Sequence, residues 1–300
     1  MKIGILSFRP IRKKLSYEES RLKKAAEALG HKARVFRAAH CQLMYDSQGE
    51  RIYYKGKRFP AIDVLIPRAS VLSDVEIRVS LIKQFQLMDV PVVNTYRAIS
   101  RAKNKLRTQQ ILHSQGIPTP TTVVVDGYES LNFAIDRVGG APVILKDPFG
   151  SYGSGVIIAE SKRAARSVLD AIWASTGPKI LMVQEYIAES GGKDTRVFVV
   201  NGRVVASMQR SAQAEEFRSN MELGGEATAV KASKAYAKLA IESTKALKLD
   251  VAGVDIIQTK NGPAILEVNS NPGFRSLERV TEIDVATKII EFAVKKAKKD

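Results

Sequence analysis

The chain has 300 residues, 45% of them apolar, so it can bury a core and form roughly one to three domains. No apolar run approaches the length of a membrane span, and the apolar start at residues 1–8 is too short for a signal sequence. We therefore expect a soluble, cytoplasmic chain. The single cysteine, Cys41, excludes an intramolecular disulfide, and with only three histidines a zinc site is poorly supplied.

Lysine and arginine outnumber aspartate and glutamate by 47 to 31, which gives a formal net charge of +16. Long-range attraction then predicts an anionic partner. Nucleic acid, an acidic peptide and a nucleotide all meet that condition, so charge alone does not choose among them. The sequence contains no recognised nucleic-acid-binding motif that would favour the first.

Residues 1–93 form the first of three blocks. A strand-like opening run precedes a stretch with helical spacing, Glu18–Leu29, and Gly30 stands where a helix C-terminal cap belongs. Two more strand-like runs follow at 32–36 and Ile62–Pro67. Strands that alternate with helices predict a small open α/β sheet.

Residues 94–182 form the second block, which opens with a predicted helix over Arg97–Gln115. Strand-like runs follow at 121–125, Ala141–Lys146 and 155–159, and a glycine-rich loop separates the last two.

Residues 183–300 form the third block. It holds strand-like runs at 196–200 and 203–208, a predicted helix over Ser233–Leu247 and a closing amphipathic helix over Lys288–Lys299. Between the two helices lie two apolar runs, VAGVDIIQ and PAILEVN, joined by TKNG. The asparagine–glycine pair in the link favours a hairpin.

Three oxygen-bearing side chains interrupt that apolar hairpin: Asp255, Glu267 and Asn269. A buried carboxylate is costly unless it is paired or binds a metal. Glu267 and Asn269 are two residues apart, so they share one face of their strand. Oxygen ligands on adjacent strands suit a hard cation such as Mg²⁺. The alternative is that Asp255 merely ends a strand and Glu267 is solvated.

The hairpin register decides whether these groups can meet. A two-residue Asn-Gly loop would pair Asp255 with Val268 and put Asp255 and Glu267 on opposite faces. We therefore predict a three-residue loop, Lys260–Gly262, with Gly262 at positive φ and Asp255 directly opposite Glu267.

A lysine ends the apolar strand at Ala141–Lys146, and a G-x-x-G-x-G loop follows it. Glycines let backbone N–H groups approach phosphate oxygens, and the lysine adds a point charge. An ordinary flexible turn is the alternative interpretation. The candidate phosphate-binding residues are Lys146, Gly150, Ser151, Gly153, Ser154 and Gly155.

The run ILMVQEYI, Ile180–Ile187, is apolar and then turns polar. Such a segment can face an adenine with its backbone, although a buried strand end is the simpler interpretation. The candidate adenine-side residues are Gln184, Glu185, Tyr186 and Ile187.

Among a set of candidate cations, Arg196 and Arg210 stand in or beside predicted strands and not on an obviously solvated helix. Arginine forks match carboxylates and phosphates, although a surface salt bridge is the alternative for any one of them. These candidates are Lys105, Arg196, Arg210 and Arg218, with Asn220.

Together these features resemble the ATP-grasp superfamily, and within it the RimK-type glutamate ligases. The resemblance covers nearly the whole chain and is sharpest over Gly139–Gly273. It rests on the motifs NKLRT, GGAPVILK, GSYGSGV, VQEYI, KDTRVFVV, FRSN, GGEA, VAGVDI and LEVNSNPG. It implies an α/β (α+β) ATP-grasp fold with an N-terminal domain over 1–93, a central lobe over 94–182 and a C-terminal lobe over 183–300. ATP would lie between the last two.

The resemblance also implies roles for residues. Phosphate contacts would come from Lys105, Lys146 and the glycine loop, and adenine would face Gln184–Ile187. Asp194 matches an ATP-site acid. Two Mg²⁺ or Mn²⁺ ions would be held by Asp255, Glu267 and Asn269, and Arg196 and Arg210 would be the catalytic cations. The motif on the phosphate side matches Arg218, Ser219 and Asn220.

The implied reaction forms an amide through an acylphosphate, with ATP converted to ADP and phosphate. The expected substrates are L-glutamate and an acceptor peptide or protein tail, either a ribosomal protein C-terminus or a growing poly-glutamate chain. The segment Arg9–Tyr17 matches no family motif, so the acceptor stays open. The basic clusters at Arg9–Arg37 and Arg97–Arg107 predict an acceptor that is acidic or becomes so.

Three other interpretations remain open at this stage. A related ligase could act on a coenzyme or an amino-acid carrier protein. An ATP-binding regulator could lack chemistry, although the complete set of Asp255, Glu267 and Asn269 argues against that. A basic nucleic-acid-binding module rests on charge alone, and nucleic acid is not the expected substrate. No membrane association is expected, and a homo-oligomer remains open.

Overall fold

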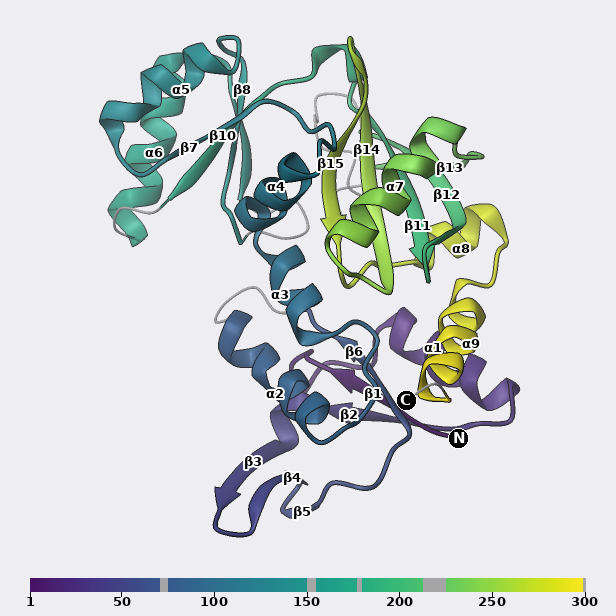
Figure 1. The fold of residues 1–300 in the computed structure, drawn as a ribbon. Helices are drawn as coiled ribbons and strands as arrows, with labels where there is room; N and C mark the ends of the chain where they lie inside the picture. The colour runs from purple at the N-terminus through teal and green to yellow at the C-terminus, as the bar shows by residue number, and fades with distance from the viewer. Residues whose placement is uncertain (71–74, 150–154, 177–179, 213–224, 299–300) are drawn as a thin grey trace.

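The computed structural model describes residues 1–70, 75–149, 155–176, 180–212 and 225–298 (Figure 1). A first domain, a central lobe and a C-terminal lobe each carry their own sheet, and α3 and α4 lie between them. The mixture of parallel and antiparallel sheets with covering helices agrees with the predicted α/β class.

The first domain is built on a three-stranded parallel sheet of order β2-β1-β6, beside a small antiparallel sheet of order β3-β4-β5. Its predicted strands and helix are all present, whereas the small sheet and the last helix were not predicted. The elements are β1 (Lys2–Ser7), α1 (Tyr17–Ala28), β2 (Lys32–Arg37), η1 (Ala38–His40), β3 (Cys41–Asp46), β4 (Gly49–Tyr54), β5 (Lys57–Arg58), β6 (Val64–Arg68) and α2 (Val75–Leu87).

The two helices of this domain cover opposite faces of its parallel sheet. Ile3 and Ile5 of β1 pack in one buried cluster with Leu22 of α1. Leu6 of β1 packs in a second buried cluster with Val79 of α2. Alternate residues of a strand point to opposite faces, so β1 contributes to both cores.

The central lobe carries an antiparallel sheet of order β7-β10-β8-β9, with both of its longer helices packed against the same buried side chains. The linking helices are α3 (Tyr96–Lys103) and α4 (Lys105–Ser114). The lobe itself comprises β7 (Thr122–Val125), η2 (Tyr128–Ser130), α5 (Leu131–Arg137), β8 (Val143–Lys146), β9 (Val156–Ala159), α6 (Lys162–Thr176) and β10 (Leu181–Glu185).

The face of this sheet that the helices do not cover carries polar side chains. Leu145 of β8 and Val183 of β10 belong to the helix-covered core. Lys146 and Gln184 follow them by one residue, so their side chains point to the opposite face.

The C-terminal lobe is a five-stranded antiparallel sheet of order β13-β12-β11-β14-β15. Its elements are η3 (Ala188–Ser190), β11 (Lys193–Val200), β12 (Arg203–Ser211), β13 (Glu226–Ala229), α7 (Lys234–Ala246), β14 (Val251–Thr259), β15 (Gly262–Asn269), α8 (Arg275–Thr281) and α9 (Val285–Ala297).

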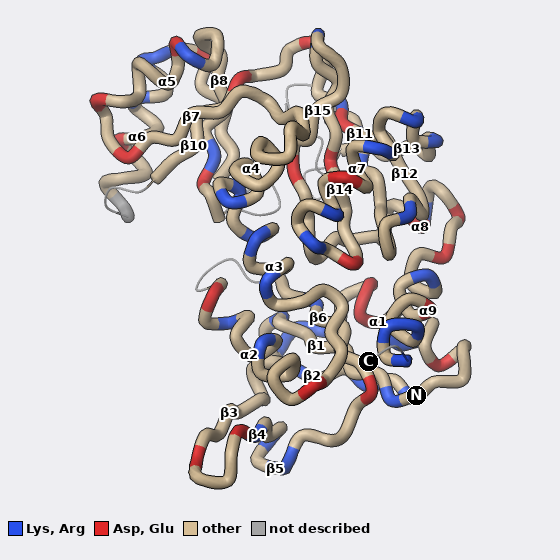
Figure 2. The backbone as a smooth tube through the Cα atoms, viewed as in Figure 1, with Lys and Arg blue, Asp and Glu red and all other residues tan. Residues whose placement is uncertain are grey.

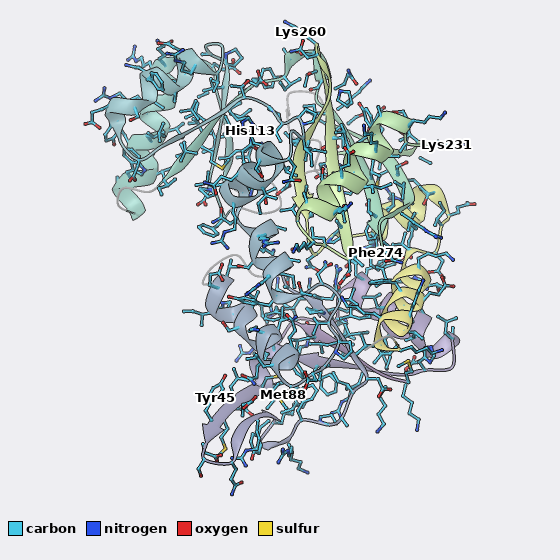
Figure 3. The ribbon with its side chains drawn as sticks, in the orientation of Figure 1. Tyr45, Met88, His113, Lys231, Lys260 and Phe274 are labelled. Atoms are coloured by element: carbon cyan, nitrogen blue, oxygen red, sulfur yellow. The ribbon has the colours of Figure 1, made fainter. Side chains whose placement is uncertain are left out.

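The end of the chain returns to the first domain. Ile289 and Ile290 of α9 share one buried cluster with Ile5 of β1 and Leu22 of α1. Phe274, which precedes α8, is fully buried in the same cluster and lies where the C-terminal lobe meets the first domain (Figure 3). The two units therefore share a core and do not behave as separate hydrophobic bodies.

The single helix predicted over Arg97–Gln115 is wrong, because the chain breaks at Asn104 into α3 and α4. Asn104 has an extended backbone, and its side chain accepts a hydrogen bond from the N–H of Arg107. An asparagine N-cap of this kind satisfies one of the unpaired N–H groups at a helix start. The break makes Lys105 the first residue of α4.

The predicted pairing of Asp255 with Glu267 is confirmed, but the predicted three-residue loop is wrong. Thr259 pairs with Gly262, and its hydroxyl bonds the Asn261 N–H (3.1 Å) and the Gly262 carbonyl (2.8 Å), which closes a tighter turn. Gly262 does have the expected positive φ, at +111°.

The tight turn alone would pair Asp255 with Leu266. A β-bulge between the pairs that involve Asp255 and Ile256 shifts the register by one residue and brings Glu267 opposite Asp255. Leu266 is the extra residue, because Ile256 pairs with Ile265 while Asp255 pairs with Glu267. Leu266 packs against Ile257 and Ala264 on the face opposite Ile265. The bulge therefore brings an apolar residue and an acid, adjacent in sequence, to the same face.

Asn94, which lies just before α3, is hydrogen-bonded to the backbone of the C-terminal lobe. Its Nδ2 donates to the carbonyls of Val251 (2.7 Å) and Ser270 (3.0 Å). Its Oδ1 accepts from the N–H groups of Asp250 (2.6 Å) and Val251 (2.9 Å). The side chain is only 3% exposed, so water cannot replace these partners.

Replacing Asn94 with alanine should therefore leave buried backbone groups unsatisfied. We expect Asn94→Ala to lower the free energy of unfolding by about 3 kcal/mol or more, as measured by urea denaturation. Asn261→Ala, in the exposed hairpin turn, is the matched control and should change it by less than about 0.5 kcal/mol. Equal effects of the two substitutions would contradict the bridging role of Asn94.

Candidate functional site

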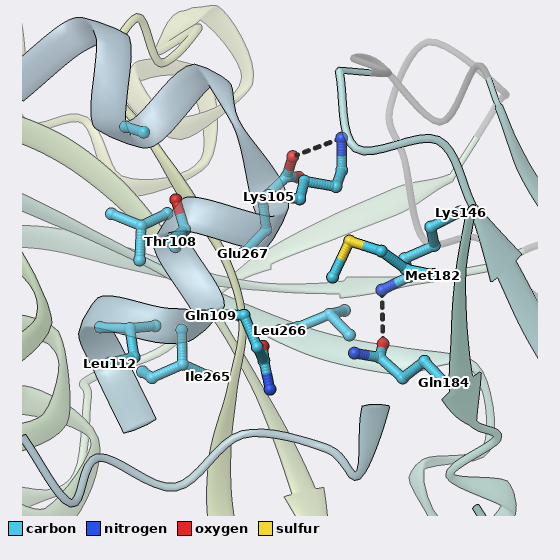
Figure 4. Close-up of a pocket in the computed structure, with 12 residues that line it drawn as sticks. Lys105, Thr108, Gln109, Leu112, Lys146, Met182, Gln184, Ile265, Leu266 and Glu267 are labelled. Carbon is cyan, nitrogen blue, oxygen red and sulfur yellow. Dashed lines mark hydrogen bonds and ion pairs between the residues drawn. The ribbon is translucent and has the colours of Figure 1, made fainter. Parts of the chain in front are cut away.

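A cavity lies between α4, the open face of the central sheet and β15 of the C-terminal lobe (Figure 4). Its empty volume is about 390 Å³, part of it open to solvent. Charged and amide groups stand among apolar walls, as is common in small-molecule sites. The lining residues are Ala102, Lys105, Thr108, Gln109, Leu112, Lys146, Met182, Gln184, Ile265, Leu266, Glu267 and Val268.

Lys146 is held on the central sheet by an amide. Its Nζ donates to Oε1 of Gln184 over 2.5 Å, and Nε2 of Gln184 donates to the Thr122 hydroxyl over 2.9 Å. Burial lowers the pKa of Lys146 to about 8, with the Glu267 charge opposing the shift and the Lys105 charge adding to it. Among the described residues its hydrogen-bond partner is a neutral amide, so its charge remains available to an anion in the cavity.

Lys105 stands at the start of α4, and its backbone N–H donates to the carbonyl of Pro148 over 2.8 Å. Its Nζ lies 3.7 Å from Oε1 of Glu267 across the cavity (Figure 4). The Glu267 side chain is 34% exposed, so this acid remains accessible from the cavity.

A network of buried charges extends across the C-terminal sheet. Both carboxylate oxygens of Asp255 accept bonds from Arg196 at 2.7 Å, and Nη2 of Arg210 lies 2.9 Å from Oδ2 of Asp255. Arg210 also donates two bonds to Asp194. These arginines thus belong to neither solvated surface pairs nor a free cationic patch.

Burial affects the two acids of this network differently. It raises the pKa of Asp255, but Arg196 and Arg210 outweigh burial and hold that pKa below its ordinary value. Burial also raises the pKa of Asp194; Arg210 opposes that shift and the Asp255 charge adds to it, so the pKa stays above its ordinary value. Asp255 is therefore the more firmly ionised acid.

Asp255, Glu267 and Asn269 share one face of the hairpin. Asp255 pairs with Glu267 and Gly253 pairs with Asn269, whose Nδ2 lies 3.4 Å from Oδ2 of Asp255. Within the described ranges, no three His, Cys, Asp or Glu side chains gather as a metal-binding group. A cation here would need the amide oxygen of Asn269 beside two carboxylates, a donor set that suits Mg²⁺.

The segment after β10 provides an apolar corner. Ile187 is 7% exposed and packs with Ile257, Ala264 and Leu266. Glu185 turns its carboxylate back to the chain, where Oε1 accepts from the N–H of Thr121 over 2.8 Å. Its side chain is thus used within the protein.

Two families of domains match the chain almost end to end. The RimK PreATP-grasp domain matches residues 1–99, and the RimK-like ATP-grasp domain matches residues 102–293. This chain belongs to the RimK-like ATP-grasp family. As a member of that family it is an ATP-dependent ligase. The family and the fold class predicted from the motifs are confirmed.

Individual relatives agree with this assignment. The chain is 41% identical to a probable alpha-L-glutamate ligase 2 of Pseudoalteromonas atlantica, over 99% of this chain and 97% of the relative. A RimK domain ATP-grasp protein of Sphaerobacter thermophilus shares the fold, with a TM-score of 0.77, 23% identity and coverage of 98% of this chain and 100% of that one. The ligase PsnB, solved with a precursor variant, Mg and ADP, has a TM-score of 0.75, 18% identity and 98% coverage of both chains.

Part of the predicted ATP-grasp site lies outside the described residues, namely Gly150, Ser151, Gly153, Ser154, Arg218, Ser219 and Asn220. Gly155 is described and has a φ of +73°. Its carbonyl accepts from the N–H of Asp147 over 2.9 Å, and a Cβ there would stand 3.1 Å from Cβ of Asp147. The glycine therefore allows the loop ends to close.

Met182, Leu266 and Gln109 line the cavity but were not among the predicted site residues. Alternation along LMVQE could have identified Met182, because it lies two residues before Gln184 on the same strand. Leu266 depends on the bulge, which no local pattern announces. Among the described residues, no helix is both long enough and apolar enough to cross a membrane.

Asp255 and Glu267 should differ sharply in their effect on stability. Asp255→Ala would leave Arg196 without its buried counter-ion and Arg210 with Asp194 alone, so we expect a loss of about 3 kcal/mol or more. Glu267→Ala removes a partly exposed acid and should cost about 1 kcal/mol or less. Urea denaturation of both variants measures the difference, and comparable losses would contradict it.

Proposed function

We propose that this ligase forms an amide bond between the amine of L-glutamate and a carboxylate of a peptide or protein acceptor. One oxygen of the acceptor carboxylate attacks the γ-phosphorus of ATP, the bond to the bridging oxygen breaks, and ADP leaves. The glutamate amine then attacks the acyl carbon, the acyl–phosphate bond breaks, and amide, phosphate and one proton are produced. The name of the Pseudoalteromonas relative supports the amino acid.

The observation that carries this proposal is the cavity with two lysines on one side and Glu267 of the acid–amide set on the other. We assign Lys105 and Lys146 to the ATP phosphates, because both present an ammonium group to the cavity. We assign the adenine to the apolar corner of Ile187 and Leu266, beside the backbone of 184–187. Positioning of this kind lowers the entropic cost of the reaction.

Two divalent ions, Mg²⁺ or Mn²⁺, would be held by Asp255, Glu267 and Asn269. When bound they would neutralise phosphate charge. The structure of PsnB with Mg and ADP supports a cation beside the nucleotide. Glu267 is the accessible carboxylate of the set, whereas Asp255 already accepts from two arginines.

We further propose that Arg196 and Arg210 are the catalytic cations, presenting positive charge where the transferred phosphoryl group carries negative charge. Asp194 positions Arg210 by pairing with its Nε and Nη2. Removal of Asp194 should then act through Arg210 and not through direct contact with the nucleotide.

The acceptor that best fits the formal charge of +16 is an acidic one. A ribosomal protein tail or a growing poly-glutamate chain fits that description. PsnB, which was solved with a precursor, supports a peptide acceptor. A coenzyme or an amino-acid carrier protein is the second candidate.

Incubating the full chain with ATP, Mg²⁺, an acidic peptide and each amino acid in turn tests the proposal. We expect ADP and phosphate, with a mass increase of the peptide that corresponds to one glutamate or more. Glu267→Gln should abolish turnover, because it removes a charged oxygen ligand. The proposal would be wrong if AMP and pyrophosphate appeared, if no amino acid were added, or if Glu267→Gln retained full activity.

The Lys146 charge makes ATP use dependent on pH. Its pKa of about 8 means that the ammonium loses its proton as pH rises through that value. We expect kcat/KM for ATP, which reports the free enzyme, to fall above about pH 8. Lys146→Arg keeps its charge and should remove this fall. Lys146→Met should have a low kcat/KM for ATP at every pH. An identical alkaline fall in Lys146→Arg would assign it to another group.

A further inference from the structure

The three parallel strands of the first domain end side by side in polar residues. Ser7 of β1 pairs with Arg37 of β2 on one side and with Arg68 of β6 on the other. Arg37 Nη1 donates to the Ser7 hydroxyl over 3.0 Å, and the backbone N–H of Arg9 lies 3.4 Å from the same oxygen. The strand ends and the loop after β1 therefore form one cationic cluster.

This cluster stands at a switch point of the sheet. The chain leaves β1 for α1 on one face and leaves β6 for α2 on the other. In open α/β sheets, ligands bind outside the carboxyl ends of adjacent strands whose connections diverge in this way. Here that position lies between Ser7 and Arg68.

The C-terminal lobe faces the same position. Arg68 Nη2 donates to the carbonyl of Pro272 over 3.0 Å. The two residues before Pro272 carry buried acceptor atoms, Oγ of Ser270 and Oδ1 of Asn271, that have no hydrogen-bond partner in the described structure. Buried polar atoms normally have hydrogen-bond partners, so these two acceptors indicate a position for a ligand or a water molecule.

Arg37 is held by neutral groups, and the Arg9 side chain has no acidic partner among the described residues. Arg37 Nη2 donates to the carbonyl of Lys13 over 2.7 Å, and its Nη1 partner is a hydroxyl. Nε of Arg9 is buried without a partner in the described part of the chain. No carboxylate of the described residues forms an ion pair with Arg9 or Arg37, so their charge is not neutralised locally.

Lys103 connects this cluster to the reaction centre. It is the last residue of α3, which lies between the first domain and the other two lobes (Figures 1 and 2). Burial lowers its pKa to about 8; the Glu267 charge raises that pKa, and the charges of Lys105 and Arg68 lower it. The charges of the acid at the cavity and of the arginine at the strand ends therefore both act on Lys103.

We propose that Arg9, Arg37, Arg68 and Lys103 form a subsite for a substrate carboxylate that does not react. This inference rests on the proposed function, in which both glutamate and the acceptor bring such a carboxylate. Arginine forks bind carboxylates through paired N–H groups. The ATP phosphates have their own lysines in the cavity, so this second group of cations serves a different anion.

Two substitutions test the subsite with little structural cost. Arg9→Gln and Lys103→Gln each remove a cation whose side chain makes no hydrogen bond among the described residues. We expect KM for one carboxylate substrate to rise about tenfold to a hundredfold, the value of a charge-assisted hydrogen bond, while KM for ATP stays the same. Arg203→Gln, at an exposed strand start, is the matched control and should change none of these constants.

The two sources of the carboxylate separate in the same assay. A rise in KM for glutamate alone assigns the subsite to the amino acid, and a rise for the acceptor alone assigns it to the peptide. Replacing the non-reacting carboxylate of that substrate by a carboxamide should weaken binding to the wild-type chain but not further to Arg9→Gln. Unchanged KM values for both substrates, or an equal rise for ATP, would overturn the subsite.

Direct binding keeps the test independent of ligation. Calorimetric titration of glutarate, a simple dicarboxylate, should show binding to the full chain in the absence of ATP. The Arg9→Gln, Lys103→Gln double variant should lose it. If glutarate binds but no amino acid is ligated, the proposed function fails and the subsite stands; if the wild-type chain does not bind glutarate, the subsite is refuted.

Discussion

The buried charges of the C-terminal sheet constrain the rest of the site. Isolated, each would cost several kcal/mol to remove from water, so they must be neutralised in place. The strand pairing achieves this, because Asp194 lies opposite Arg210 on β12 and Arg196 lies opposite Asp255 on β14. A shift of one residue on either strand would turn one member of a pair to the far face. The register of three central strands is therefore fixed by electrostatics as well as by packing.

The edge strand β15 meets a second requirement. It must present Glu267 and Asn269 to the charged network while its other face closes the core against α7 through Val268 and Ile265. The tight turn at Thr259, followed by regular pairing, would align Leu266 with Asp255. Glu267 would then lie on the face opposite Asp255, so regular alternation cannot meet both requirements. The bulge absorbs one residue, and the residue that it absorbs becomes an apolar wall of the cavity. A correction of register and a binding surface thus come from the same irregularity.

The sequence predicts the parts of this molecule that depend on local chemistry. Periodicity predicts β1, α1 and the hairpin, and the cost of burying Asp255 predicts that it is paired. The counter-ions of Asp255 could not be predicted, because Arg196 is 59 residues away and only the strand order makes them neighbours. The break at Asn104 was predictable in principle, since asparagine favours N-caps, but the continuous helical spacing on both sides masks it. The shared core of α9 and the first domain also depends on contacts that no local pattern encodes.

That break has a consequence for the reaction. Lys103 ends α3 and Lys105 begins α4, so one non-helical residue, Asn104, separates the two lysines. Lys105 lines the cavity and lies 3.7 Å from Glu267, whereas Lys103 responds to both Glu267 and Arg68. In an unbroken helix, residues two apart point roughly 200° from each other and continue along one axis. The cap at Asn104 instead changes the direction of the chain between them. One acid, Glu267, therefore interacts with a lysine of the ATP cavity at 3.7 Å and, through its charge, with a lysine of the proposed carboxylate subsite, which couples the two proposed sites electrostatically.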